Sequence, residues 1–228
     1  MPELPEVETV RRGLLPHLEQ ATLKRVETRR KDLRFPFPPD FASRLEGQRI
    51  AKLERRAKYL LAELASGDIL LMHLGMTGRF TVVEGANGNL LGAYVYDTGA
   101  DPAHDHVIFH LKSGQQIVYN DPRRFGFMVI VGANEREAHP LLRHLGVEPL
   151  SADLTAAYLA RRAAGKKVNL KAFLMDQRIV AGLGNIYASE ALWRAQLKPG
   201  RLARTLASKT GQPNDRSAAL ADAIKSVL

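Results

Sequence analysis

The segment YLLAELASGDILLMHL (residues 59–74) contains two apolar runs, residues 59–64 and 69–74, on either side of the turn-forming triplet Ser66-Gly67-Asp68. Short runs of this kind bounded by Ser, Gly and Asp are typical of strands joined by a tight turn. The segment therefore predicts an antiparallel hairpin.

The same pattern recurs on both sides of this hairpin. Strands are predicted at residues 22–28, 50–55, 59–64, 69–74, 79–83, 107–111, 116–119 and 127–131. Several short strands at this spacing favour an antiparallel sandwich or barrel. Residues 85–103 hold four glycines and one proline, so we expect an irregular excursion there.

Helical patterns occur before and after these strands. Pro5 suits the first position of a leading helix, Glu6 and Glu8 suit its dipole, and Pro16 is expected to bend or end it. Its apolar stripe consists of Val7, Val10, Leu14 and Leu18. Further helices are predicted at residues 154–164, 170–176, 186–196 and 218–228, with a cap at 150–153 and some helical character at 134–144.

The chain is therefore expected to be an α+β protein of two domains. The first is a β-sandwich with flanking helices (residues 1–134), followed by a connector (135–150) and an all-helical domain (151–228).

Composition restricts the function classes. There are 33 Lys and Arg residues against 24 Asp and Glu residues, giving a net charge of +9 and a pI near 9.9. This balance favours a polyanionic partner over generic solubility. The absence of cysteine excludes disulfides, thiolate nucleophiles and Cys-ligated zinc. No apolar run approaches a membrane span and no signal peptide is recognisable, so a cytoplasmic protein without membrane contact is expected.

The N-terminus offers a reactive group. If Met1 is removed, Pro2 has a free secondary amine that can attack a carbonyl carbon and form an iminium. Glu3 beside it could protonate an opening sugar ring. The alternative interpretation is a helix-start proline with a glutamate that complements the helix dipole. If Met1 stays, the Pro2 nitrogen is an amide and cannot attack.

Three other segments suit nucleic-acid binding. Lys58, in the cationic run 55–58, could contact a phosphate or donate a proton, or simply protect a strand edge. Met76 lies between two glycines and could wedge into a base stack, or fill a core. Arg123 and Phe125, on a turn from Asp121, could enter DNA, or belong to an ordinary surface turn.

The segment Gly182-Leu-Gly-Asn185 is a turn before a predicted helix. Its backbone N–H groups are expected to point outward and bind a DNA phosphate, with Lys166, Lys167 and Lys171 adding positive charge. The alternative is a plain helix–helix turn. It is not a dinucleotide fingerprint, because no strand precedes it and the third glycine is missing.

Together these segments resemble the bacterial formamidopyrimidine-DNA glycosylase family, also called MutM. The motifs are PELPEVET (2–9), RAKYL (56–60), HLGM (73–76), DPRRFG (121–126) and GLGNIYASE (182–190), in family order along the whole chain. Leu4 and the Arg123-Arg124-Phe125 turn resemble the purine-directed branch rather than the endonuclease VIII branch.

The resemblance implies a helix–two-turn–helix C-terminal domain, excision of 8-oxoguanine and ring-opened purines, and strand cleavage by β- and δ-elimination in base excision repair. In the family's terms Pro2 is the Schiff-base nucleophile, Glu3 the proton donor at the sugar, and Lys58 the proton donor for β-elimination. Met76, Arg123 and Phe125 fill the gap left by the extruded base. The resemblance further implies that the DNA backbone is held by His73, His104, Arg124, Lys166, Lys171 and Asn185.

The resemblance also implies a C-terminal extension beyond Leu228. Family members add a loop over the extruded base and a four-cysteine zinc finger that carries a DNA-binding arginine. We therefore expect no cofactor in this chain, which has no cysteine, and reduced activity and DNA affinity. The expected partner is damaged duplex DNA, bound by a monomer. Two alternatives are a DNA-binding remnant without turnover and a small-molecule enzyme, such as a tautomerase, that uses an N-terminal proline.

Overall fold

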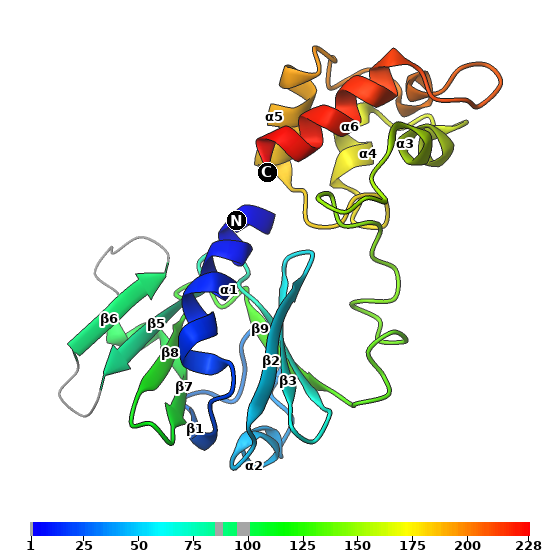
Figure 1. Ribbon diagram of the computed structural model, residues 1–228. Helices are drawn as coiled ribbons and strands as arrows, with labels where there is room; N and C mark the ends of the chain where they lie inside the picture. The colour runs from blue at the N-terminus through cyan, green and yellow to red at the C-terminus, as the bar shows by residue number, and fades with distance from the viewer. Residues whose placement is uncertain (1, 85–88, 95–100) are drawn as a thin grey trace. The chain divides into compact units, whose positions relative to one another are not determined.

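The computed structural model describes residues 2–84, 89–94 and 101–228, with side chains given for all of these except 89–94 (Figure 1). The chain divides into two compact units, Met1–His139 and Pro140–Leu228. The division lies inside residues 135–150, and each unit has its own hydrophobic core.

The first unit contains two antiparallel sheets, as predicted. One has five strands in the order β1-β7-β8-β5-β6, and the other four in the order β2-β3-β4-β9. The strands are β1 (Leu23–Thr28), β2 (Ile50–Arg56), β3 (Tyr59–Leu64), β4 (Ile69–His73), β5 (Arg79–Glu84), β6 (Asn89–Tyr94), β7 (Asp105–Leu111), β8 (Gln116–Asn120) and β9 (Phe127–Val131). The hairpin predicted from residues 59–74 is the β3–β4 pair, in which Leu61 lies opposite Leu71.

One strand contradicts the sequence analysis. Residues 85–103 were expected to be irregular, but β6 pairs with β5, with Phe80 opposite Tyr94. Gly92 weakens the strand pattern in the sequence, because glycine has a low strand preference. In the structure, pairing with β5 outweighs that preference. A 3₁₀ turn, Pro102–His104, follows, while residues 85–88 and 95–100 of the predicted excursion lie outside the described residues.

Helix α1 (Leu4–Leu18) joins the two sheets into one core. It contacts β2 and β3 of one sheet and β5 and β6 of the other (Figure 1). The predicted apolar stripe is buried as expected. Pro16 lies inside the last turn of the helix, which ends at Leu18. The short helix α2 (Phe41–Leu45), which was not predicted, packs against β1.

The second unit is all-helical, with α3 (Ala156–Ala163), α4 (Leu170–Met175), α5 (Asn185–Arg194), α6 (Asp215–Val227) and the 3₁₀ turn Ala203–Leu206. The predicted cap at 150–153 is wrong, because Thr155 caps α3 by accepting a hydrogen bond from the Tyr158 N–H at 3.0 Å. Residues 134–144 form turns rather than a helix. Among the described residues, no helix has the length and apolar character needed to cross a membrane.

Candidate active site and nucleic-acid interface

The N-terminal end of α1 holds Glu3 in place. Glu3 is the N-cap and only 2% exposed, and its backbone N–H donates to the Glu6 carboxylate at 2.9 Å as half of a capping box. Pro2 directly precedes this cap and is half-buried. Pro2 therefore lies directly before the capped N-terminus of the helix.

Lys58 lies in the same neighbourhood. It occupies the two-residue turn between β2 and β3, where Ala57 adopts a φ of +53°, and it is only 8% exposed. Burial lowers the pKa of Lys58, and the negative charges of Glu3 and Glu6 oppose that effect more weakly. The structure thus brings Lys58 and Glu3, two of the three predicted catalytic residues, within electrostatic reach of each other.

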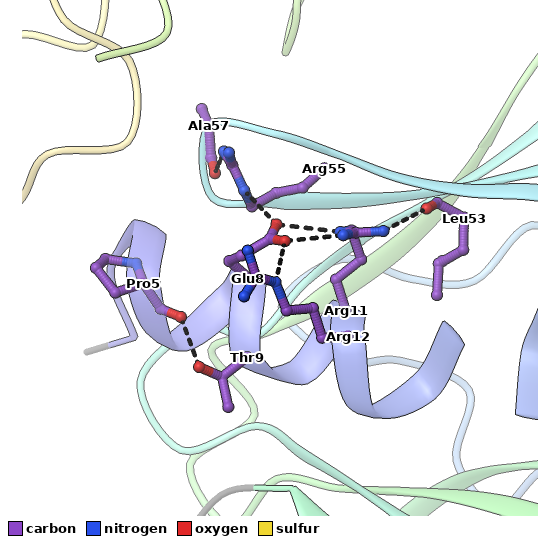
Figure 2. A network of polar contacts seen from close by, with 8 residues as sticks. All are labelled: Pro5, Glu8, Thr9, Arg11, Arg12, Leu53, Arg55 and Ala57. Atoms are coloured by element: carbon purple, nitrogen blue, oxygen red, sulfur yellow. Dashed lines mark hydrogen bonds and ion pairs between the residues drawn. The ribbon is translucent and has the colours of Figure 1, made fainter. Parts of the chain in front are cut away.

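A cluster of charged groups ties this turn to α1 (Figure 2). Glu8 on α1 pairs with Arg11 at 2.8 Å and with Arg55 on β2 at 3.1 Å. Arg55 also donates to the Ala57 carbonyl at 2.9 Å, in the turn that carries Lys58. The hydrogen bond from Arg11 is the main cause that lowers the pKa of Glu8 to about 2, and hydrogen bonds from Arg12 and Arg55 add to it. One carboxylate therefore links α1 to the Lys58 turn.

His73, at the end of β4, is packed rather than open. Its ring stacks on Phe127 at 5.2 Å, and its Nδ1 accepts a hydrogen bond from the Gly75 N–H at 3.0 Å. Burial, with smaller contributions from Lys58 and Arg34, lowers the pKa of His73 to about 4. At neutral pH this imidazole is uncharged, and through its Nδ1 it holds the start of the loop that follows.

Two loops carry the predicted wedge residues. Residues 74–78 connect β4 to β5, and residues 121–126 connect β8 to β9. Met76 is 39% exposed and Phe125 is 43% exposed, with the Arg123 guanidinium 4.7 Å above the Phe125 ring. A Cβ placed on Gly75 would lie 2.3 Å from the Gly126 nitrogen, so the backbones of the two loops touch. The structure therefore brings the three residues onto adjoining loops.

Two of the residues predicted to bind the DNA backbone belong to the second loop or adjoin it. Arg124 adopts a φ of +55°, is exposed, and lies 3.5 Å from Asp32. The His104 carbonyl accepts a hydrogen bond from the Asp121 N–H at 3.0 Å. Arg124 thus lies on the loop that carries Arg123 and Phe125, and the His104 backbone adjoins the start of that loop.

In the second unit, the predicted turn precedes α5, which begins at the exposed Asn185. Gln177 holds this turn, donating from Nε2 to the Leu183 carbonyl and accepting from the Gly182 N–H, each at 2.7 Å. The expectation that the N–H groups here point outward is therefore wrong for Gly182. Lys166 is exposed in the loop before α4, and Lys171 is half-buried in its first turn.

The part of the chain that the structure describes contains no set of side chains suited to bind a metal ion. No group of three or more His, Asp or Glu side chains there is arranged to hold a metal ion, and the sequence contains no cysteine.

Sequence models of two domains match nearly the whole chain. The formamidopyrimidine-DNA glycosylase N-terminal domain matches residues 1–128, and the helix–two-turn–helix domain of the same enzymes matches residues 145–228. The chain belongs to the formamidopyrimidine-DNA glycosylase family. This is a family of DNA glycosylases of base excision repair, so the predicted fold class and family are confirmed.

Curated formamidopyrimidine-DNA glycosylases align along the entire chain. Those of Bradyrhizobium sp. (strain ORS 278) and Nitrobacter winogradskyi are each 59% identical over 228 residues, which is 100% of this chain and 78% of the relative. The chain thus spans 78% of the length of these relatives.

Solved structures of formamidopyrimidine-DNA glycosylases share the fold. MutM from Thermus thermophilus has a TM-score of 0.78 and 37% identity, over 99% of this chain and 74% of that one. The Lactococcus lactis enzyme in complex with an abasic site containing DNA has a TM-score of 0.82 and 27% identity, over 99% of this chain and 76% of that one.

Three supporting residues escaped the sequence analysis. Glu8 was interpreted as a dipole partner, Asp121 as the start of a turn, and Gln177 was not singled out. Glu8 and Asp121 make hydrogen bonds to residues that are distant in sequence, namely Arg55 and Thr77. Gln177 instead holds its own loop through Gly182 and Leu183. The indication available in the sequence was that Glu8 and Asp121 are polar residues inside two of the motifs.

Proposed function

We propose that this chain excises oxidised purines, namely 8-oxoguanine and formamidopyrimidines, from duplex DNA and then cleaves the abasic strand, with the Pro2 amine as nucleophile. The observation that carries the proposal is the buried Lys58, whose pKa is lowered, in electrostatic reach of Glu3 beside Pro2. A buried ammonium whose pKa is lowered, within electrostatic reach of a buried carboxylate, suits a role in proton transfer.

In the proposed reaction the Pro2 nitrogen attacks C1′ of the damaged nucleotide, the bond from C1′ to the base breaks, and the base leaves with the proton that the Pro2 nitrogen loses. Glu3 protonates the ring oxygen as the sugar opens, which leaves an iminium between Pro2 and C1′. The iminium withdraws electrons, so C2′ loses a proton to water and the bond from C3′ to its phosphate oxygen breaks. Lys58 supplies a proton to the departing phosphate oxygen in this β-elimination. Loss of the C4′ proton to water then breaks the bond from C5′ to its phosphate oxygen in a second elimination and releases the 5′ phosphate.

Binding would use two groups of residues. Met76, Arg123 and Phe125 would enter the space left by the extruded nucleotide, since apolar and aromatic side chains can replace lost stacking. The contacts to the DNA backbone would come from His73, His104, Arg124, Lys166, Lys171 and Asn185. In this proposal the chain acts as a monomer in the cytoplasm, and sedimentation of the free and DNA-bound chain tests its oligomeric state.

Borohydride trapping on abasic-site DNA tests the chemistry, because reduction of the iminium joins the chain covalently to the DNA. An intact mass first establishes that Met1 is absent. Pro2→Gly should weaken or abolish trapping while leaving DNA binding in place. The matched control is Pro5→Ala, which changes a proline of the same helix start without altering the terminal amine.

The outcomes separate the possible functions. Trapping lost with Pro2→Gly but kept with Pro5→Ala supports the proposal. DNA binding without trapping in the unmodified chain identifies a binding protein without turnover. Equal loss of binding and trapping in Pro2→Gly would contradict the role assigned to the amine.

A further inference from the structure

The two loops that carry the proposed wedge residues are both crossings between the sheets. Residues 74–78 leave the four-stranded sheet at β4 and enter the five-stranded sheet at β5. Residues 121–126 leave the five-stranded sheet at β8 and return to the other at β9. Each loop therefore depends on two sheets for its position, and a direct link between the loops would set their relative geometry.

Asp121 provides that link. Its carboxylate is fully buried and accepts hydrogen bonds from three neutral donors on different segments. These donors are the Thr77 hydroxyl at 2.5 Å, the Tyr119 hydroxyl at 3.2 Å and the Gly126 N–H at 2.9 Å. A buried carboxylate is costly unless its oxygens are bonded, so this arrangement strongly favours one geometry of the two loops.

Thr77 extends the link to the tips themselves. Its hydroxyl donates to Asp121 and accepts a hydrogen bond from the Arg123 N–H at 3.2 Å. Thr77 directly follows Met76 in the chain, so this single hydroxyl connects the residue beside one proposed wedge to the backbone of another.

Tyr119 fills the space between the crossings. A Cβ on Gly78 would lie 2.4 Å from its hydroxyl oxygen, and a Cβ on Gly126 would lie 1.9 Å from it. The hydroxyl therefore touches the backbone of both loops. Burial and the neighbouring Asp121 raise the pKa of Tyr119 well above its usual range, so the hydroxyl remains a hydrogen-bond donor.

We propose that Asp121, Thr77 and Tyr119 are positioning residues that lock the two loops together, so that Met76, Arg123 and Phe125 enter DNA as one preorganised group. The inference rests on the proposed function, in which those three residues enter the duplex. Preorganisation matters because ordering separate loops during binding would cost free energy. None of the three positioning residues needs to touch DNA.

The test uses a duplex with a tetrahydrofuran abasic analogue and 2-aminopurine beside it, whose fluorescence reports unstacking. Thr77→Val keeps the shape of the side chain and removes both hydrogen bonds. We expect the rate of the fluorescence change to fall about 3- to 10-fold, as for the loss of about one net hydrogen bond. Thr77→Ser restores the hydroxyl and should restore the rate.

A structural role alone would not produce this pattern. Thr81→Val, a matched change on β5, should leave the rate unchanged, and thermal unfolding identifies any variant that is misfolded. Tyr119→Phe offers a second variant, which loses only the bond to Asp121. Trapping on single-stranded abasic DNA, which has no base stack to enter, should remain at the unmodified level in Thr77→Val.

Met76→Ala and Arg123→Ala distinguish the inference from the proposed function. If both leave the fluorescence change intact, the wedge assignment is wrong and the inference falls with it. If both abolish it while folded Thr77→Val and Tyr119→Phe behave like the unmodified chain, the wedge assignment stands and the locking role is refuted.

Discussion

Replacing Glu8 by Gln tests whether one carboxylate holds α1 to the turn that carries Lys58. The substitution keeps the size of the side chain but removes its charge, and so weakens the contacts to Arg11, Arg12 and Arg55. Because Arg55 also donates a hydrogen bond to the Ala57 carbonyl, the substitution should lower the free energy of unfolding and make the position of Lys58 less well defined.

The size of the effect follows from the pKa. The guanidinium groups lower the pKa of Glu8 from 4.5 to about 2, and each pKa unit corresponds to about 1.4 kcal/mol, which sets a ceiling of about 3 kcal/mol. Arg12 is 75% exposed, and solvent screens its part. We expect Glu8→Gln to lower the free energy of unfolding by about 1–2 kcal/mol at pH 7.

The effect should depend on pH in one direction. A carboxyl whose pKa is lowered in the folded state stabilises the fold above its unfolded pKa, near 4.5, and this contribution is lost as pH falls toward 2. The unmodified chain and Glu8→Gln should therefore differ most at pH 5 and above, and converge near pH 2.

Urea unfolding at pH 7, 5 and 3, followed by circular dichroism, measures these differences. The single tryptophan, Trp193, lies in the other unit and is 73% exposed, so its fluorescence would not report on this site. Hydrogen exchange in peptides from residues 4–18 and 50–56 assigns the loss to α1 and β2. Glu84→Gln, an exposed change at the end of β5, should cost less than about 0.5 kcal/mol. Equal stability of Glu8→Gln and Glu84→Gln at pH 7 would refute the reasoning.

Three further predictions concern the first unit. Because burial lowers the pKa of Lys58, cleavage of abasic DNA should decline as pH rises through a value below 10.5; Lys58→Met should remove this limb and slow cleavage about 10²- to 10⁴-fold, whereas Lys24→Met on β1 should do neither. A pKa of about 4 for His73 means that the folded state should lose stability as pH falls from 6.5 toward 4. Urea unfolding at pH 7 and 4.5 measures this, and the free energy of unfolding should fall between those pH values by about 2 kcal/mol less in His73→Phe than in the unmodified chain. An equal fall in both proteins would contradict the prediction. In Gly75→Ala the new Cβ would lie 2.3 Å from the backbone of the other loop at a φ of +63°, so the free energy of unfolding should fall by about 3 kcal/mol or more. Gly47→Ala has open space around its Cβ and should lower it by only about 1 kcal/mol through backbone strain. Similar melting temperatures for the two variants would exclude the close approach of the loops.

Much of the fold could be predicted because its causes are local. Alternating apolar runs with Gly and Asp turns identified eight of the strands, and helical spacing identified α1 and the four helices of the second unit. The motifs at Pro2, Lys58, Met76 and Asn185 also stand on continuous stretches of sequence. The strand β6 and the short helix α2 were missed, because pairing and packing with distant segments overrode local preference. The cap of α3 was predicted at residues 150–153, whereas the structure has it at Thr155.

The chain's composition and order alone determined its family, its basic charge and the residues with suitable chemistry. Only the tertiary structure decided which polar residues hold those residues in place. Glu8 meets Arg55 across 47 positions of sequence, and Thr77 meets Asp121 across 44. No local pattern encodes such pairs, because a hydrogen bond depends on a few tenths of an ångström between atoms that the packing of two sheets and a helix brings together.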